Sequence, residues 1–163
     1  MTPTEEFIAS LTGLGTHDLF LLRTHARQRP DASVGVFHLF KGLRGEWIPG
    51  REIAWLIAKV YAYCPISHKP GATLPRQLGH CRPSRQEAQK RFTERFDRML
   101  LLPFDQVEPQ IRWALRRLAA RGFALDWVKL TRDLSLWERE ATRRDWAKEF
   151  IGTEKNHERG TSC

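Results

Sequence analysis

The sequence predicts an all-α protein, folded as a two-lobed helical bundle of roughly eight helices. Apolar residues recur at intervals of three and four along most of the 163-residue chain, which is the spacing of one helix face. Residues that start and stop helices bound most of these segments. Alternating apolar and polar residues, the pattern of a half-buried strand, are nearly absent. A chain of this length buries enough surface to fold without disulfides.

The N-terminal lobe, expected at residues 1–63, is predicted to consist of helices and short turns. Thr2-Pro3-Thr4-Glu5 is a capping box with proline at the first helical position, and this pattern opens a helix. Pro30 and Pro65 each mark a helix end, because the residue before a proline is pushed out of the helical conformation. The helices expected in this lobe cover residues 2–13, 16–27, 33–42 and 51–63.

Residues 64–83 are predicted to form a basic loop that connects the two lobes. The segment is rich in proline, glycine, cysteine and histidine, which are typical of irregular structure. It also carries Lys69, Arg76 and Arg82. These cations could lie against a phosphate backbone or could simply face solvent, and the sequence favours neither interpretation.

Cysteine usage argues against disulfides and against a metal site. The three cysteines, Cys64, Cys81 and Cys163, lack the spacing of a disulfide framework, so free thiols in a reducing compartment are expected. Cys64 and Cys81 could join His68 and His80 around zinc, but the spacings match no usual zinc knuckle. We therefore predict no metal and no cofactor, with Cys64 buried and the histidines in loops.

The C-terminal bundle, expected at residues 84–152, opens with a second capping box, Ser84-Arg85-Gln86-Glu87. The helix that follows is predicted to bury an apolar stripe and to present an arginine stripe beside it. The apolar stripe is Phe92, Phe96 and Met99, and the arginine stripe is Arg91, Arg95 and Arg98. One side of this helix should pack against the protein, and the other should be cationic.

Three further helices are expected in this bundle. The first begins near Pro109 and ends at Gly122, and Asp126 caps the second. The last stops at Gly152, which leaves residues 153–163 as a frayed polar tail. The residues at core spacing in the last two helices are Trp127, Leu130, Leu134, Trp137, Trp146 and Phe150. We therefore expect these side chains to be buried rather than available for base stacking.

The charge balance favours a polyanionic partner. Lysine and arginine number 27 against 19 acidic residues, which gives a net charge of +8 and a pI near 9.9. The excess is greatest in the second half, and most of it is arginine, whose planar guanidinium pairs bidentately with phosphate. Nucleic acid is therefore the first candidate partner.

Sequence motifs of catalysis are missing. The chain has no Walker-type glycine loop, no Gly-x-Ser-x-Gly elbow and no His-Glu-x-x-His pair. Its scattered acidic residues mostly have a basic residue within about four positions, where a surface ion pair is expected. The chain also lacks a signal-peptide pattern and an apolar run long enough to span a bilayer. We predict a non-enzymatic, cytoplasmic protein without membrane contact.

Several motifs of the C-terminal bundle occur together in one known family. Leu125-Asp126-Trp127 begins one helix, and Arg91-Phe92 lies in an earlier one. The other matching residues are Arg95, Arg98, Met99, Leu100, Leu101, Leu118, Leu130, Asp133, Leu134, Trp137, Arg144, Trp146, Ala147 and Phe150. Together with the length and basicity, these residues resemble the CasB family, the small subunit of Cascade, which is the type I-E CRISPR surveillance complex.

The resemblance implies a two-lobed helical protein without enzymatic activity that works in antiviral defence. Two copies are expected to lie head to tail in Cascade and to contact its backbone and large subunits. They would help to hold the displaced non-target DNA strand once the guide RNA has paired with its target, which stabilises the R-loop. The partners implied are single-stranded DNA and the guide RNA–DNA complex, bound without sequence preference. Free protein is expected to bind DNA or RNA in the same manner.

The arginines expected to contact nucleic acid lie outside the apolar stripes. They are Arg23 and Arg27 in the first lobe, Arg76 in the loop, and Arg91, Arg98, Arg112, Arg116, Arg117, Arg121, Arg143 and Arg144 in the second lobe. A sequence-specific helix-turn-helix regulator is the alternative, but it needs base-reading side chains in the first turns of one helix. A helical scaffold that binds acidic proteins is a third possibility. The sequence does not separate arginines that contact DNA from those that contact other subunits.

Overall fold

A computed structural model describes residues 2–24 and 51–161, with side chains for residues 2–24 and 52–154. Within these ranges the chain forms eight α-helices, one 3-10 helix and no strand, so the all-α prediction is confirmed. The helices are α1 (Pro3–Thr12), α2 (Thr16–Thr24), α4 (Arg51–Tyr63), α5 (Leu74–Gly79), α6 (Gln86–Leu101), η2 (Phe104–Gln106), α7 (Glu108–Ala120), α8 (Trp127–Ser135) and α9 (Glu140–Thr161). The expected helix 33–42 and Arg27 lie outside the described residues.

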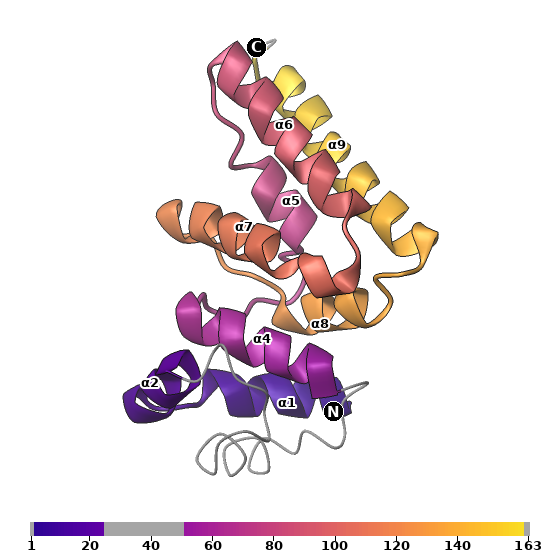
Figure 1. The fold of residues 1–163 in the computed structure, drawn as a ribbon. Helices are drawn as coiled ribbons and strands as arrows, with labels where there is room; N and C mark the ends of the chain where they lie inside the picture. The colour runs from indigo at the N-terminus through magenta and orange to yellow at the C-terminus, as the bar shows by residue number, and fades with distance from the viewer. Residues whose placement is uncertain (1, 25–50, 162–163) are drawn as a thin grey trace.

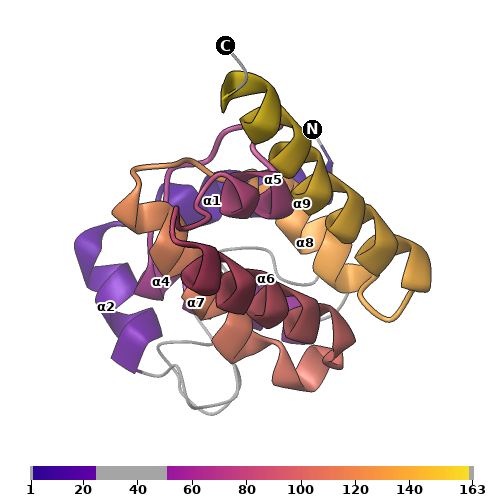
Figure 2. The same ribbon diagram turned by 90° about the horizontal axis from the view of Figure 1, so that it is seen from above.

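Helices α7 and α8 occupy the middle of the molecule. In Figure 1, α1, α2 and α4 lie at one end, and α5, α6 and α9 lie at the other. Helix α4 contacts both α7 and α8, while α5 packs against α7 and α9. Figure 2, turned by 90°, shows α6 drawn over α7, with the longer α9 to one side. Helices α6 and α7 meet through Phe92 and Trp113, whose ring centroids are 5.2 Å apart.

A single hydrophobic cluster runs through all of these contacts. It includes Phe7 of α1, Ile57 of α4, Leu115 of α7, Trp127 of α8 and Phe150 of α9, each of which is buried. Residues from both expected lobes therefore share one core, while the division into lobes at residues 64–83 stays a prediction. Within the described residues, no helix has the length and apolar character needed to cross a membrane.

Two of the three expected caps form as the local sequence indicates. The Thr2 hydroxyl accepts from the Glu5 backbone N–H at 3.2 Å, and the Glu5 carboxylate accepts from the Thr2 N–H at 3.0 Å. The Asp126 carboxylate accepts from the Lys129 N–H at 2.9 Å. The capping box at Ser84 is wrong, because Arg85 is the N-cap of α6 and no side chain accepts from the first turn.

Gly122 ends α7 as predicted. Its φ of 68° lies in the left-handed region, and the Phe123 N–H donates to the Leu118 carbonyl at 3.0 Å. Helix α8 is shorter than expected, because it ends at Ser135 rather than at Trp137. Trp137 is nevertheless buried, and its indole N–H donates to the Leu102 carbonyl at 2.8 Å.

Two segments that the sequence predicts to be irregular are helical. Helix α5 lies within residues 64–83, where Pro75 is a loop signal in the sequence although proline is compatible with a first helical turn. Helix α9 continues through Gly152 to Thr161, so residues 153–161 are not a frayed tail. A glycine inside a helix costs about 1 kcal/mol, and burial of Thr153 against Gly79 offsets this cost.

Candidate nucleic-acid interface

Helices α6 and α7, with the residue that follows α7, bring five of the eleven predicted arginines to neighbouring positions. On α6, Phe92, Phe96 and Met99 are buried as predicted. Phe96 and Phe92 stack on Phe150 of α9, with ring centroids 4.1 and 6.2 Å apart, respectively. This packing fixes the rotation of α6 about its axis and leaves Arg91 and Arg98 exposed.

Arg95 lies at the centre of the arginines that α6 and α7 share. Its guanidinium lies 4.6 Å from the Trp113 ring centroid, and its Nε donates to the Gln110 side chain at 3.0 Å. Burial, followed by the charges of neighbouring arginines, lowers the pKa of Arg95. These neighbours are Arg116, Arg117 and Arg98. Like charges are therefore held close together here, and a bound anion would relieve their repulsion.

This group is named the α6–α7 arginine face, and it consists of Arg91, Arg95, Arg98, Arg116, Arg117 and Arg121. The guanidinium of Arg117 lies 5.7 Å from the Phe92 ring centroid, so this arginine reaches across to α6. Arg121 lies 5.6 Å from the Phe123 ring centroid. Packing on aromatic rings orders these side chains without neutralising them.

An open pocket extends this face toward the start of α6. Its lining includes Arg82, Arg85, Arg117 and Arg121, and the uncapped N–H groups of the first turn of α6 lie next to it. The predicted nucleic-acid-binding residues do not include Arg85 and Arg95, although the arginine stripe of α6 already contained Arg95. Arg82 is engaged elsewhere, because its Nη2 donates to the Phe150 carbonyl at 2.7 Å.

Arg112 is less available than predicted. It pairs with Glu108 at 3.1 Å, and Glu108 also pairs with Lys59 of α4 at 2.7 Å. The Arg112 side chain is only 28% exposed, and its Nε is buried without a hydrogen-bond partner. Arg112 therefore joins α4 to α7, and it is half-buried rather than part of an exposed track.

Four predicted track residues lie on other helices. Arg23 on α2 and Arg76 on α5 are exposed and donate to the carbonyls of their own segments. On α9, Arg144 pairs with Glu140 at 3.3 Å. Arg143 is half-buried and donates to the Leu100 carbonyl at 3.3 Å, which holds α9 against the end of α6. These four do not belong to the α6–α7 arginine face.

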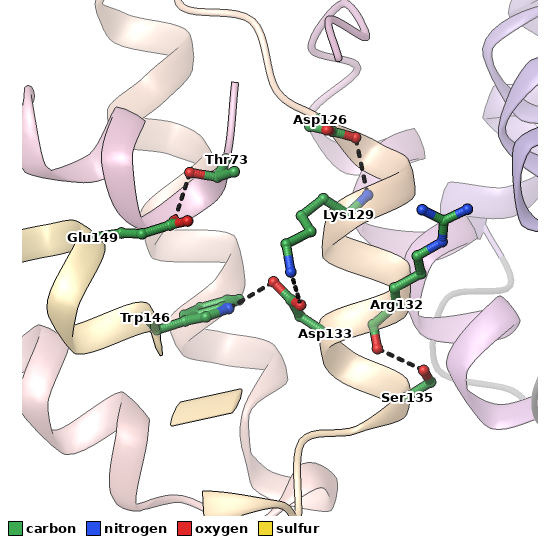
Figure 3. Close-up of polar contacts among 8 residues, drawn as sticks. All are labelled: Thr73, Asp126, Lys129, Arg132, Asp133, Ser135, Trp146 and Glu149. Atoms are coloured by element: carbon green, nitrogen blue, oxygen red, sulfur yellow. Dashed lines mark hydrogen bonds and ion pairs between the residues drawn. The ribbon is translucent and has the colours of Figure 1, made fainter. Parts of the chain in front are cut away.

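Three of the motif residues that carry the family resemblance, Asp126, Asp133 and Trp146, hold the fold together (Figure 3). Asp133 of α8 is buried and accepts from the Trp146 indole at 2.8 Å and from the Lys129 ammonium at 2.7 Å. The Asp126 carboxylate, besides capping α8, accepts from the Gly71 N–H at 2.9 Å. These contacts join α8 to α9 and to the segment before α5. Other motif residues, Arg91, Arg95 and Arg98, belong to the α6–α7 arginine face itself.

Cys64, Cys81 and His68 each contact a backbone group of the fold. Cys64 and Cys81 donate to carbonyls of α7, and His68 accepts from the Trp127 N–H at 3.1 Å. Burial raises the pKa of both thiols, against the opposing effect of nearby arginine charges. Among the described residues, no three His, Cys, Asp or Glu side chains gather in the way that a metal ion requires.

Comparison with known proteins gives one consistent result. The model of the CRISPR-associated protein Cse2 family matches residues 20–150. The crystal structure of CasB from Thermus thermophilus is similar with a TM-score of 0.74 and 25% identity, over 93% of this chain and 99% of that chain. CasB from M. ruber matches with a TM-score of 0.74 and 19% identity, over 96% of this chain and 97% of that chain. No curated protein sequence matches this chain.

Proposed function

This chain belongs to the CRISPR-associated protein Cse2 family, and we propose that it holds the displaced non-target DNA strand as the small subunit of a type I-E Cascade complex. In this role, the α6–α7 arginine face contacts the sugar-phosphate backbone of the strand. The proposal includes a second copy of the chain and the backbone and large subunits of Cascade as protein partners. Family membership favours this role over that of a sequence-specific helix-turn-helix regulator.

The observation that carries the proposal is the concentration of cations around Arg95. The neighbouring charges that lower the pKa of Arg95 all belong to arginines. The positive charge concentrated on this surface favours binding of a polyanion. Arginines spread over two helices read charge and not base identity, which suits a strand of any sequence.

Such contacts have a clear effect on R-loop formation. Replacing a DNA duplex by an RNA–DNA duplex is nearly balanced in free energy, so protein contacts to the displaced strand can decide the outcome. A non-catalytic role is consistent with this chemistry, because binding a backbone requires fixed cations and no reacting group. The carboxylates of Glu108, Asp133 and Glu140 are engaged in ion pairs with basic side chains, which also agrees with a non-catalytic role.

The test is a titration of the purified protein against scrambled single-stranded and duplex DNA at two salt concentrations. We expect binding that is insensitive to sequence and that weakens as salt increases. Tight binding to one duplex sequence would support a regulator instead. If the protein bound neither single-stranded nor duplex DNA, the remaining interpretation would be a helical scaffold that binds acidic proteins.

A further inference from the structure

Tyr63, the last residue of α4, is a large aromatic side chain that the core does not bury. It is 43% exposed, whereas Tyr61 on the same helix is 8% exposed and packs edge-on against Trp127 at 5.3 Å. The ring of Tyr61 is therefore part of the hydrophobic core, whereas much of the Tyr63 side chain is in contact with solvent.

Two arginines of α7 lie next to the Tyr63 ring. The Arg112 guanidinium is 4.9 Å from the ring centroid, and that of Arg116 is 6.0 Å away. Arg116 also donates to the Tyr63 hydroxyl at 3.5 Å. The ring is thus held at the edge of α7 next to the α6–α7 arginine face.

Several contacts between α4 and α7 support the position of this ring. Glu108 pairs with both Arg112 and Lys59, which fixes the Arg112 guanidinium relative to α4. The Cys64 thiol donates to the Leu115 carbonyl, and this contact ties the end of α4 to α7. Arg116, in contrast, is exposed, so its charge can reach a ligand.

An exposed aromatic ring beside an exposed guanidinium suits one unpaired nucleotide. Bases stack on aromatic side chains whatever their identity, and arginine binds the adjoining phosphate. In a duplex, both faces of each base are already covered by neighbouring bases. A stacking platform therefore distinguishes single-stranded from duplex nucleic acid, which arginines alone do only weakly.

We propose that Tyr63 is a base-stacking platform for an unpaired nucleotide, with Arg116 on the adjoining phosphate and Arg112 as the residue that positions the ring. The proposal rests on the proposed function and adds to it a preference for single strands. It assigns a ligand-binding role to Tyr63, which sequence patterns place only at the end of a helix.

The test compares Tyr63→Leu and Tyr63→Phe with the wild-type protein. Each protein is titrated with a mixed-sequence single strand, with an abasic strand of the same length and with a duplex. Tyr63→Leu should weaken binding to the mixed strand about tenfold, while binding to the other two and the salt dependence stay unchanged. Tyr63→Phe should bind like the wild type. In a strand that carries 2-aminopurine, the fluorescence of this base should be quenched when the wild type binds, and it should be quenched less when Tyr63→Leu binds.

Three outcomes separate this proposal from the one on which it rests. Equal losses for the mixed and abasic strands would overturn the platform, because the leucine variant would then have disturbed the surface in general. Unchanged affinity for the mixed strand would also overturn it, while salt-dependent binding would keep the proposed function intact. If the wild type bound none of the three ligands, the proposed function itself would fail. Circular dichroism and urea unfolding check that each variant is folded.

Discussion

Neutralising three arginines of the α6–α7 arginine face should reduce the salt dependence of binding. The variant is Arg98→Gln/Arg116→Gln/Arg117→Gln, in which all three residues are exposed and surround Arg95. Removing one phosphate interaction with a single strand lowers the slope of log affinity against log salt by roughly 0.7. If all three side chains bind phosphate, the slope falls by about 2, so a fourfold increase in salt costs the wild type about sixteenfold more affinity than the variant.

The fold should tolerate these changes. Exposed substitutions usually alter the free energy of unfolding by less than about 0.5 kcal/mol each, and fewer positive charges near Arg95 would reduce repulsion. Arg112 is left unchanged in this variant because it is half-buried and pairs with Glu108, so replacing it would disturb the packing of α4 against α7.

The assay is fluorescence anisotropy with a scrambled single strand at several salt concentrations. The matched control, Lys69→Gln/Arg139→Gln/Lys148→Gln, removes the same charge from positions on other segments. In reconstituted Cascade, the arginine variant should shorten the R-loop lifetime and leave guide-RNA loading unchanged. Equal slopes for the arginine variant and the wild type, with both folded, would refute the assignment of this face. Equal losses for the two triple variants would show that only net charge matters.

Three further predictions concern the support of the interface. Asp133→Ala should lower the free energy of unfolding in urea by about 1–3 kcal/mol, because it leaves the buried Trp146 indole without an acceptor; Asp133→Asn, which keeps an acceptor oxygen, should cost less. Gly79→Ala should cost about 1–3 kcal/mol, because the added Cβ meets Thr153, and Thr153→Ala in the same chain should recover part of this loss in a double-mutant cycle. Cys81 should be alkylated more slowly in the native protein than in urea at pH 8, because burial raises its pKa and so lowers the thiolate fraction; equal rates would contradict its burial.

Local signals are sufficient for most helices and fail where distant residues decide. The capping box at Thr2 and the left-handed Gly122 depend on a few neighbouring residues, so the sequence alone predicts them. Gly152 is a helix-end signal in the sequence, but α9 continues because Thr153 packs against Gly79 of α5, more than 70 positions away along the chain. The packing that overrides a local signal is not visible in the local sequence.

The same distinction holds for the interface. Helical spacing places Arg91 and Arg98 outside the apolar stripe of α6, and both are exposed. Spacing does not reveal that Lys59 of α4 shares Glu108 with Arg112, which withdraws Arg112 from the surface. Spacing also does not reveal that Tyr63 of α4 lies next to Arg112 and Arg116 of α7. Such pairings depend on how α4 packs against α7, which a single sequence without contact information does not specify.

The central claim is that the α6–α7 arginine face lies against the displaced strand. Glu94 lies on α6, one helical turn from both Arg91 and Arg98, so a photoreactive benzoylphenylalanine in its place samples this surface. In reconstituted Cascade, we expect it to cross-link the non-target strand only after the guide has paired with target DNA, while the same group at Lys148 of α9 does not. Cross-links at Glu94 that go to a neighbouring subunit, or that form equally without target DNA, would contradict the claim.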